Sequence, residues 1–501
     1  MSMSSRNERE RSRKPQALAA RCVAALLACG VGGCAVGPDF HRPAAPPVKH
    51  YGFRADAAQT SAAQGVAQRF NPGADVAGDW WRLFNSTQLQ AIVAEALANN
   101  PGLAATQASL RASEDSLRAG YGIFYPQARA DAAATRERLS PVQFNENARA
   151  SVFNLFTLSA SASYALDVFG GERRQLEGLA AQVDVQRATE HAAYVTLLSN
   201  IVNTVVAEAA YRAEIDATRR LIDLQREQVR LAKVQYESGT QPYSNVLVLQ
   251  SQLDSYEATI PQLEQKLAES CDLLATLVGH VPAEWSPPEI GLKDLRLPRD
   301  LPVSLPSDLV RQRPDILIAE ATAHAASANV GVATAALLPS VTLNGAYSAN
   351  GTATSHLLAS SGKAWSFGAN VGQPLFEGGT LWFNRKAAVE NYHEAMDLYR
   401  QSVLSAFAQV ADALRALDHD AAALRAQDEA LTAAQEALHL VQVNYEAGLD
   451  TYLDVLTADA LYHQAAINEL EAVALRYQDT VALYVALGGG WWRDGGPEAF
   501  H

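Results

Sequence analysis

Val234-Gln-Tyr-Glu-Ser-Gly-Thr-Gln-Pro-Tyr-Ser-Asn-Val-Leu247 and Val443-Asn-Tyr-Glu-Ala-Gly-Leu-Asp-Thr-Tyr-Leu-Asp-Val-Leu456 are two copies of one fourteen-residue stretch. They lie 209 residues apart, and seven positions carry the same residue in register. Shared helix composition alone does not produce that much identity at one offset. The chain of 501 residues is therefore predicted to contain two halves of a single architecture.

Each copy has the pattern of a helix that ends and a second helix that begins. A helical pattern leads into Tyr-Glu-x-Gly, where Gly239 and Gly448 supply the left-handed residue that a helix end needs. Apolar residues at steps of three and four precede the second copy and follow the first, which is the heptad spacing of packed helices. Each copy is thus predicted to be the tip of a helical hairpin.

The composition limits the partners of this chain. Its formal net charge is −14 and its pI is near 5.3, so nucleic acid is not an expected partner. After residue 34 we find no apolar run long enough for a membrane-spanning helix. If the chain crosses a membrane, we expect strands to do so.

Residues 1–33 are interpreted as a signal peptide, because basic residues precede an apolar stretch at 22–31 that ends in small residues and a cysteine. Two cysteines compete for a lipid. Leu26-Leu-Ala before Cys29 matches a lipobox better by local rule, and Val31-Gly-Gly before Cys34 matches it less well. A cleaved signal that leaves no lipid is the remaining alternative.

The rest of the chain has a layout that occurs twice. The predicted segments are an extended N-terminal tether at 34–79, a first repeat at 80–280, a Pro-rich linker at 281–305, a second repeat at 306–490 and a tail at 491–501. Each repeat is predicted to contain a helix, two strands and a long helical hairpin.

Two-residue alternation predicts the strands. From Phe156 to Val168 apolar residues alternate mostly with Ser and Thr, which is typical of a strand with one apolar and one polar face. The Ala-rich stretch 127–138 is its expected partner. In the second repeat, alternation over 341–348 and 365–375 predicts another pair.

Long helical patterns follow both pairs of strands, at 172–237 and 380–447. At about 1.5 Å per residue, each helix would be roughly 100 Å long. A compact domain needs no such length, whereas a structure that bridges a wide gap does. Pro261 is expected to kink the first return helix, at 242–279, because the interior hydrogen bond to residue 257 is lost.

Four strands cannot close a transmembrane barrel, because an open edge leaves unpaired backbone groups in hydrocarbon. Bacterial barrels start at about eight strands. Three copies would contribute twelve strands, and the same threefold axis would gather the long helices into a tube. The predicted fold class is therefore an α+β membrane protein: a trimeric twelve-stranded β-barrel joined to an α-helical coiled-coil barrel in the periplasm, with two tandem repeats per chain.

Several motifs stand out as a set. They are Cys34-Ala-Val-Gly-Pro-Asp-Phe40, the two Tyr-Glu-x-Gly tips, the strand ends Phe169-Gly-Gly171 and Phe376-Glu-Gly-Gly379, and Ala486-Leu-Gly-Gly-Gly-Trp491. Together they resemble the TolC-like outer-membrane factors, specifically the NodT-type lipoproteins of RND efflux systems, over residues 34 to about 492. The resemblance favours Cys34 over Cys29 as the lipidated residue. It implies diacylglycerol and palmitate on Cys34 and no cofactor.

The same resemblance implies a homotrimeric exit duct, lipid-anchored in the cell outer membrane and extending into the periplasm. Such a duct docks with a periplasmic adaptor protein and an inner-membrane RND pump, and passes drugs or other small molecules without doing chemistry. One alternative is the duct of a type I (ABC) protein secretion system. A less favoured alternative is a periplasmic adaptor or structural coiled-coil lipoprotein, because adaptors carry one hairpin and this chain has two.

By the resemblance, the periplasmic ends of the helices constrict the duct around residues 452–457. Leu453 matches a constricting apolar position and Asp454 an acidic ring position. This chain departs from the family pattern twice, because Thr457 replaces the usual second acid and Asp450 replaces a base found in some members. The alternative for Asp454 is a solvated helix carboxylate.

Tyr445 matches a tyrosine of the latch that holds the hairpins shut, and Tyr236 is its counterpart in the first copy. Gly239 and Gly448 belong to the same tips. Packing within a hairpin is the alternative role for both tyrosines.

No enzymatic motif is found. The eleven histidines are dispersed, and the sequence has no His-Glu-x-x-His motif, no paired cysteine ligands and no Gly-rich phosphate loop. We therefore expect neither an enzyme nor a metal site.

Overall fold

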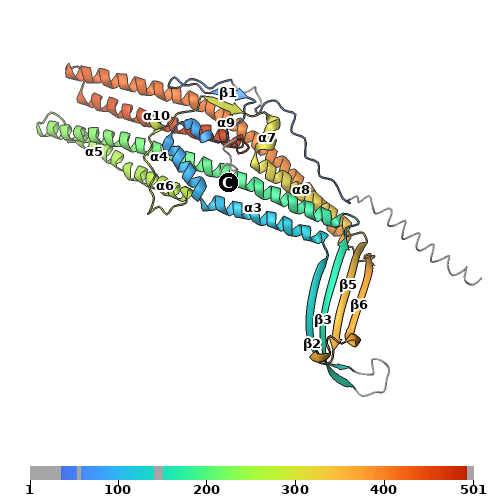
Figure 1. Cartoon of the computed structure of the whole chain (residues 1–501). Coiled ribbons are helices and arrows are strands. Elements are labelled where there is room, and N and C mark those ends of the chain that lie inside the picture. The colour runs from blue at the N-terminus through green and yellow to red at the C-terminus, as the bar shows by residue number, and fades with distance from the viewer. Residues whose placement is uncertain (1–34, 53–57, 140–149, 494–501) are drawn as a thin grey trace, which may run out of the picture. The chain divides into compact units, whose positions relative to one another are not determined.

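A computed structural model describes residues 35–52, 58–139 and 150–493 (Figure 1). These residues divide into two compact units, the sheet unit and the helical unit. The sheet unit falls within Met1–Arg42, Ala112–Val183 and Glu320–Asp397, and the helical unit within Pro43–Arg111, Asp184–Ala319 and Leu398–His501. The signal peptide, Cys29, Cys34 and the last eight residues lie outside the described residues.

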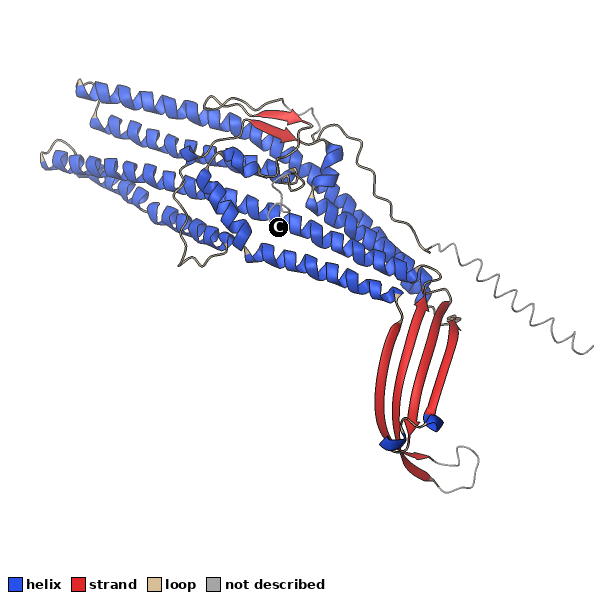
Figure 2. Cartoon of the chain, viewed as in Figure 1, coloured by secondary structure: helices blue, strands red, loops and turns tan. Residues whose placement is uncertain are grey.

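The sheet unit is built on four antiparallel strands paired in the order β2-β3-β5-β6 (Figure 2). Their bounds are Gln127–Leu139, Ser151–Leu166, Ser340–Gly351 and Lys363–Gly372. All four predicted strands are confirmed. Strand β3 starts earlier than the alternation indicates, because its first residues pair with the end of β2, where Leu139 lies opposite Ser151.

The sheet has one apolar and one polar face. Ala160 lies opposite Tyr347, and Tyr347 lies opposite Trp365, so these side chains share one face. Trp365 is 80% exposed on that face. On the other face the hydroxyl of Thr157 donates to the side-chain oxygen of Asn350 at 2.9 Å. Within the described residues, the outer edges of β2 and β6 have no strand partner.

Each half of the chain contains one helix of 67 residues, α4 (Gly171–Glu237) and α9 (Thr380–Glu446) (Figure 1). Both agree with the predicted bounds within one residue. The helices that precede the strands are α2 (Thr87–Asn99) and α3 (Pro101–Gly120) in the first half, and α7 (Pro306–Gln312) and α8 (Pro314–Ala335) in the second.

A proline sets the break between these shorter helices in each half. Asn100 and Arg313, the residues before Pro101 and Pro314, both have extended backbone conformations. This is the conformation that a following proline favours.

The return helices differ between the halves. In the first half α5 (Tyr243–Glu257) and α6 (Ile260–Val278) are separate helices, and Pro261 lies at the start of α6, where its missing N–H costs nothing. The predicted kink is therefore a break. In the second half α10 (Tyr452–Ala486) is continuous.

The core of the helical unit brings distant parts of the chain together. Trp80 and Phe84, from a short 3-10 helix, are fully buried, and the Trp80 ring stacks on Tyr484 of α10 at 5.2 Å. A second cluster nearer the tips joins α4, α5 and α10 through residues such as Val246, Leu249 and Leu456. The predicted heptad positions in α5 are therefore buried.

A small parallel sheet was missed by the sequence patterns. Strand β1 (Arg69–Pro72) pairs with β4 (Asp300–Val303), which joins the predicted tether to the predicted Pro-rich linker. Buried Gln68 donates from its side-chain nitrogen to the carbonyl of Pro298 and the hydroxyl of Thr480, both at 3.1 Å. Part of the tether is therefore packed onto the helical unit.

The expectation that no helix after residue 34 is apolar enough to span a membrane is wrong. Among the described helices, α4 and α8 have the length and the mean hydropathy that a membrane-spanning helix needs. The apolar stretch of α4 is 61% buried inside the chain, and core helices of soluble proteins pass the same test.

Candidate functional site

The two hairpin tips have the same backbone structure. Gly239 and Gly448 have φ values of 75° and 76°, in the left-handed region. At the second tip, Gly448 N donates to Tyr445 O and Leu449 N donates to Asn444 O, both at 2.9 Å. The first tip repeats both bonds at equivalent positions. Each glycine ends its helix in the way that the repeated sequence predicts.

Each tip also contains a pair of tyrosines. The rings of Tyr236 and Tyr243 lie 5.0 Å apart, and those of Tyr445 and Tyr452 lie 5.3 Å apart. Each pair joins the end of one helix to the start of the next, and thus stabilises its own hairpin. This supports the packing role of Tyr236 and Tyr445, while their role as a latch stays a prediction.

Asp454 forms a reciprocal cap with Thr451 at the start of α10. The Asp454 carboxylate accepts hydrogen bonds from the Thr451 hydroxyl at 2.5 Å and from the Thr451 amide at 2.9 Å. The Thr451 hydroxyl accepts from the Asp454 amide at 3.3 Å. Hydrogen bonds from the Thr451 side chain and then its backbone lower the pKa of Asp454. The carboxylate is therefore held ionised and exposed.

The first tip lacks this cap. Pro242 occupies the position of Thr451, and no side chain caps α5. Asn245, at the position of Asp454, instead donates from its side-chain nitrogen to Gln241 at 2.5 Å. At this pair of equivalent positions, only the second copy therefore carries a capped negative charge. The spacing Thr451-x-x-Asp454 could have revealed the cap from sequence, because it matches the capping-box pattern.

Leu453 and Thr457 lie on the exposed side of α10. Leu453 is 55% exposed, and Leu461, two turns further on, is 62% exposed. The Thr457 hydroxyl donates to the carbonyl of Leu453 at 2.9 Å, so its polarity is partly satisfied by its own helix. Leu456, on the neighbouring side of α10, packs inward. The proposed constriction residues are thus the ones that the chain leaves uncovered.

Two polar residues on the buried side of α10 face each other. Asp459 and His463 are nearly buried, with Asp459 Oδ1 at 3.7 Å from His463 Nε2. Burial raises the pKa of Asp459, and the charge of His463 opposes that rise. Burial lowers the pKa of His463, which Asp459 opposes and Arg220 on α4 reinforces. The sequence patterns gave no sign of this pairing.

A pair of aspartates, Asp420 and Asp479, links α9 to α10. Burial, followed by the hydrogen bond and charge of Asp479, raises the pKa of Asp420 to about 7. Arg476, which is 2% exposed, opposes this rise with its charge. Asp420 therefore gains or loses its proton near neutral pH.

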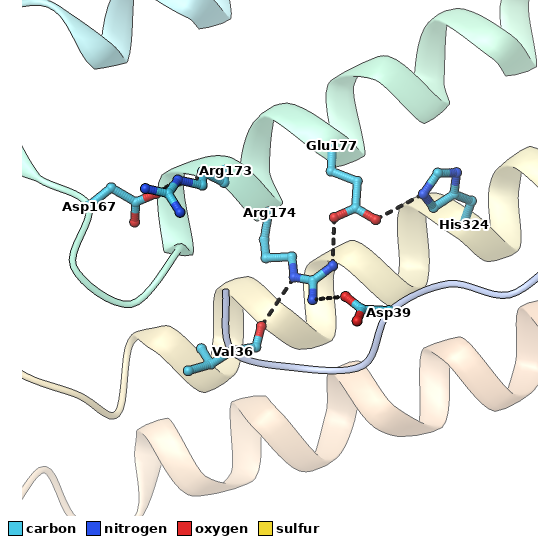
Figure 3. Close-up of polar contacts among 7 residues, drawn as sticks. All are labelled: Val36, Asp39, Asp167, Arg173, Arg174, Glu177 and His324. Carbon is cyan, nitrogen blue, oxygen red and sulfur yellow. Dashed lines mark hydrogen bonds and ion pairs between the residues drawn. The ribbon is translucent and has the colours of Figure 1, made fainter. Parts of the chain in front are cut away.

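In the sheet unit, the residues after Cys34 are held in a fixed position that we call the N-terminal clip, Ala35–Arg42 (Figure 3). Val36 N donates to Phe169 O at 3.0 Å. Arg174, whose side chain is 5% exposed, donates to Asp39 at 2.6 Å and to the carbonyl of Val36 at 3.2 Å. Arg174 thus binds the clip to the first turn of α4.

Two further residues complete this network. Arg174 also donates to Glu177 at 2.8 Å, and the other oxygen of Glu177 lies 2.9 Å from His324 Nε2 of α8 (Figure 3). The ring of His324 stacks on Phe40 of the clip at 4.6 Å. The clip is therefore bound to both α4 and α8.

Glycine is required where the clip meets the end of β3. Gly170 has φ of 79°, and a Cβ there would lie 2.4 Å from Ala35 Cα. The Phe-Gly-Gly motif at 169–171 and the string after Cys34 therefore fit against each other. Sequence patterns named both motifs but could not show that they are in contact.

Among the described residues, no group of three or more His, Cys, Asp or Glu side chains could hold a metal ion. The described polar clusters are capping, packing and ion-pair networks.

Comparisons with known proteins agree with this geometry. The family model described as outer membrane efflux protein matches residues 92–280 and 305–489. The chain is 31% identical over 423 residues to the pyoverdine export outer membrane protein OpmQ of Pseudomonas aeruginosa, covering 83% of this chain and 88% of that protein. It is 27% identical over 487 residues to the toluene efflux pump outer membrane protein TtgC of Pseudomonas putida, covering 94% and 96%.

A solved structure has the same fold. The outer-membrane channel OprN matches with a TM-score of 0.81 and 26% identity, covering 91% of this chain and all of that one.

Proposed function

We infer that this chain, which belongs to the outer membrane efflux protein family, is the outer-membrane channel of a tripartite RND-type efflux system. It is a passive exit duct for drugs or other small molecules, and we assign it no chemistry. The relatives named for pyoverdine export and toluene efflux indicate small organic molecules as the class of substrate.

The observation that carries the proposal is the open, two-faced sheet. Its apolar face exposes Trp365 and Phe367, and its outer strands leave hydrogen-bonding edges without partners in the described chain. The exposed apolar face does not suit water, and the unpaired strand edges do not suit lipid. Three copies, with β6 of one beside β2 of the next, would close a twelve-stranded transmembrane barrel with the apolar face toward lipid.

The same threefold assembly would gather the long helices into a coiled-coil tunnel in the periplasm. Each copy contributes α4 and α9, each about 100 Å long at 1.5 Å per residue. A tunnel of this length gives the solute a path across the periplasm as well as the outer membrane.

The mouth of the tunnel would be built from the hairpin tips. Leu453 and Thr457 are exposed on each chain, and Asp454 is a fixed anion beside them. Three copies around an axis would form an apolar constriction and a carboxylate ring that favours cations. Tyr236 and Tyr445 would hold the hairpins in shape.

We assign the lipid anchor, with its diacylglycerol and palmitate, to Cys34. The support is the N-terminal clip, which begins at the next residue and is bound by Arg174. The partners that we propose are two further copies of this chain, a periplasmic adaptor protein and an inner-membrane RND pump.

Deletion of the gene, followed by complementation, tests the proposal. We expect the deletion strain to accumulate a pump substrate such as ethidium, and the wild-type gene to restore efflux. Unchanged accumulation together with loss of a secreted protein would contradict it and favour a type I secretion duct.

A further inference from the structure

The charges on the four-stranded sheet are segregated by face. Side chains alternate along a strand, so Arg136 and Arg138 share the face of Ala134 on β2. The register Ala132–Leu158–Ala349–Lys363 puts Lys363 of β6 on that same apolar face. These three cations are the only charged residues of the four strands on this face.

The acids of the strands lie on the opposite face. Asp131 and Glu137 alternate with the two arginines on β2, and Asp131 lies 3.4 Å from Arg129 on its own face. Arg136, Arg138 and Lys363 are exposed, and they form no ion pair within residues 35–52, 58–139 and 150–493. Within these described residues their positive charge is exposed and unpaired.

The three cations also occupy one end of the face. Arg136 and Arg138 lie near the end of β2, and Lys363 begins β6, which is the same end of an antiparallel sheet. Tyr347 and Trp365 lie beside Lys363 on this face, as aromatic residues do at a membrane interface. The other end of this face, at residues such as Leu166 and Val371, carries no charge.

We propose that Arg136, Arg138 and Lys363 bind the phosphate groups of anionic glycolipids in the outer leaflet of the outer membrane. This rests on the proposed function, which places the face against lipid and the helices in the periplasm, so that the cationic end is outermost. The Cα atoms of Arg136 and Arg138 are about 6.7 Å apart. Each guanidinium group can donate two parallel hydrogen bonds to one phosphate group. Because only the outer end is cationic, the ligand is one confined to the outer leaflet.

The test is the affinity of the purified full-length protein, folded in detergent, for diphosphorylated lipid A, measured by native mass spectrometry. We expect tight, salt-sensitive binding that weakens about fivefold with each cation removed and roughly 100-fold in the variant R136Q/R138Q/K363Q. Arg129→Gln, on the opposite face of β2, is the matched control for Arg136→Gln and should leave the affinity unchanged.

A comparison of lipid affinities on the wild-type protein tests the proposal even if the variants fail to fold. The wild-type protein should bind diphosphorylated lipid A more tightly than its monophosphorylated form or phosphatidylglycerol. Equal affinity for phosphatidylglycerol, or an unchanged affinity in a folded triple variant, would overturn the glycolipid site and leave the duct intact. A wild-type protein that forms no membrane channel would overturn the proposed function and this inference with it.

Discussion

The side chains of Thr451 and Asp454 are joined by a hydrogen bond of 2.5 Å in a reciprocal cap at the first turn of α10. The cap holds the carboxylate in its charged form at the tip of the second hairpin, where the first hairpin has the neutral Asn245. Asp454 therefore has a local structural role, and the same geometry fixes the position of its charge. The two roles can be separated by experiment.

Replacing Asp454 with Asn removes the charge, and replacing Thr451 with Ala removes the cap while the charge remains. If three Asp454 residues form a ring, D454N should lower cation selectivity and weaken block by multivalent cations severalfold, because the ring is the source of the local negative potential. T451A should keep both properties. Planar-bilayer recordings measure them, and unchanged block in D454N would remove the ring assignment.

Gly448→Ala should destabilise the second tip by about 1 kcal/mol, because an L-residue is strained at a φ of 76°. A Cβ at Gly448 would meet no atom within 4 Å, so the strain comes from the backbone alone. Thermal unfolding followed by circular dichroism measures the change. Gly122→Ala is the control, since that site is also open and its φ is not in the left-handed region. Equal effects of the two substitutions would contradict this explanation.

The Asp420–Asp479 pair predicts a pH dependence of stability. The pKa of Asp420 is raised to about 7 in the folded chain from an ordinary value of 3.8, so the folded state binds more protons than the unfolded state between these values. The free energy of unfolding should therefore fall as the pH rises from about 4 to about 7. Above about pH 7, this pair should change the free energy of unfolding little.

Asp420→Asn should remove most of that slope and raise stability at neutral pH by an amount on the order of a few kcal/mol, because it removes the buried charge. Denaturant unfolding at several pH values measures this. An Asp420→Asn variant with the wild-type slope would show that other groups cause the pH dependence.

Arg174→Leu should release the N-terminal clip. The substitution removes the donors to Asp39, Glu177 and the Val36 carbonyl, and loss of a buried charge-assisted contact typically costs about 1–3 kcal/mol. Exchange of the Val36 amide with deuterium should then be at least roughly tenfold faster.

Arg173→Leu is the control for this change, because Arg173 is an exposed arginine on the same turn of α4 and its guanidinium lies 3.6 Å from Asp167 (Figure 3). If both variants exchange at the wild-type rate, Arg174 does not hold the clip.

Periodicity was enough to predict the large elements. Alternation around Phe156 and heptads around Leu249 each reflect burial on one side of an element, so the strands and the hairpins could be located. Gly448 marks where α9 stops, because glycine tolerates a left-handed φ, and Pro261 lies where α6 starts, because proline has no backbone N–H to donate.

The structural features that periodicity did not predict depend on contacts between distant segments. Strand β1 has four residues and pairs with a strand that contains Pro302, so neither shows a usable alternation. The contact between Arg174 and Asp39 joins residues 135 positions apart, and nothing local indicates it. The raised pKa of Asp420 likewise depends on its burial, which cannot be read from a charged residue in a helical sequence.

The mass of the folded complex extracted from the outer membrane in detergent is the most direct test of the proposed duct. Native mass spectrometry should find three mature chains, each carrying lipid on Cys34, because three four-stranded sheets close a twelve-stranded barrel. A complex of one chain, or of two chains whose eight strands close by themselves, would contradict the trimeric duct.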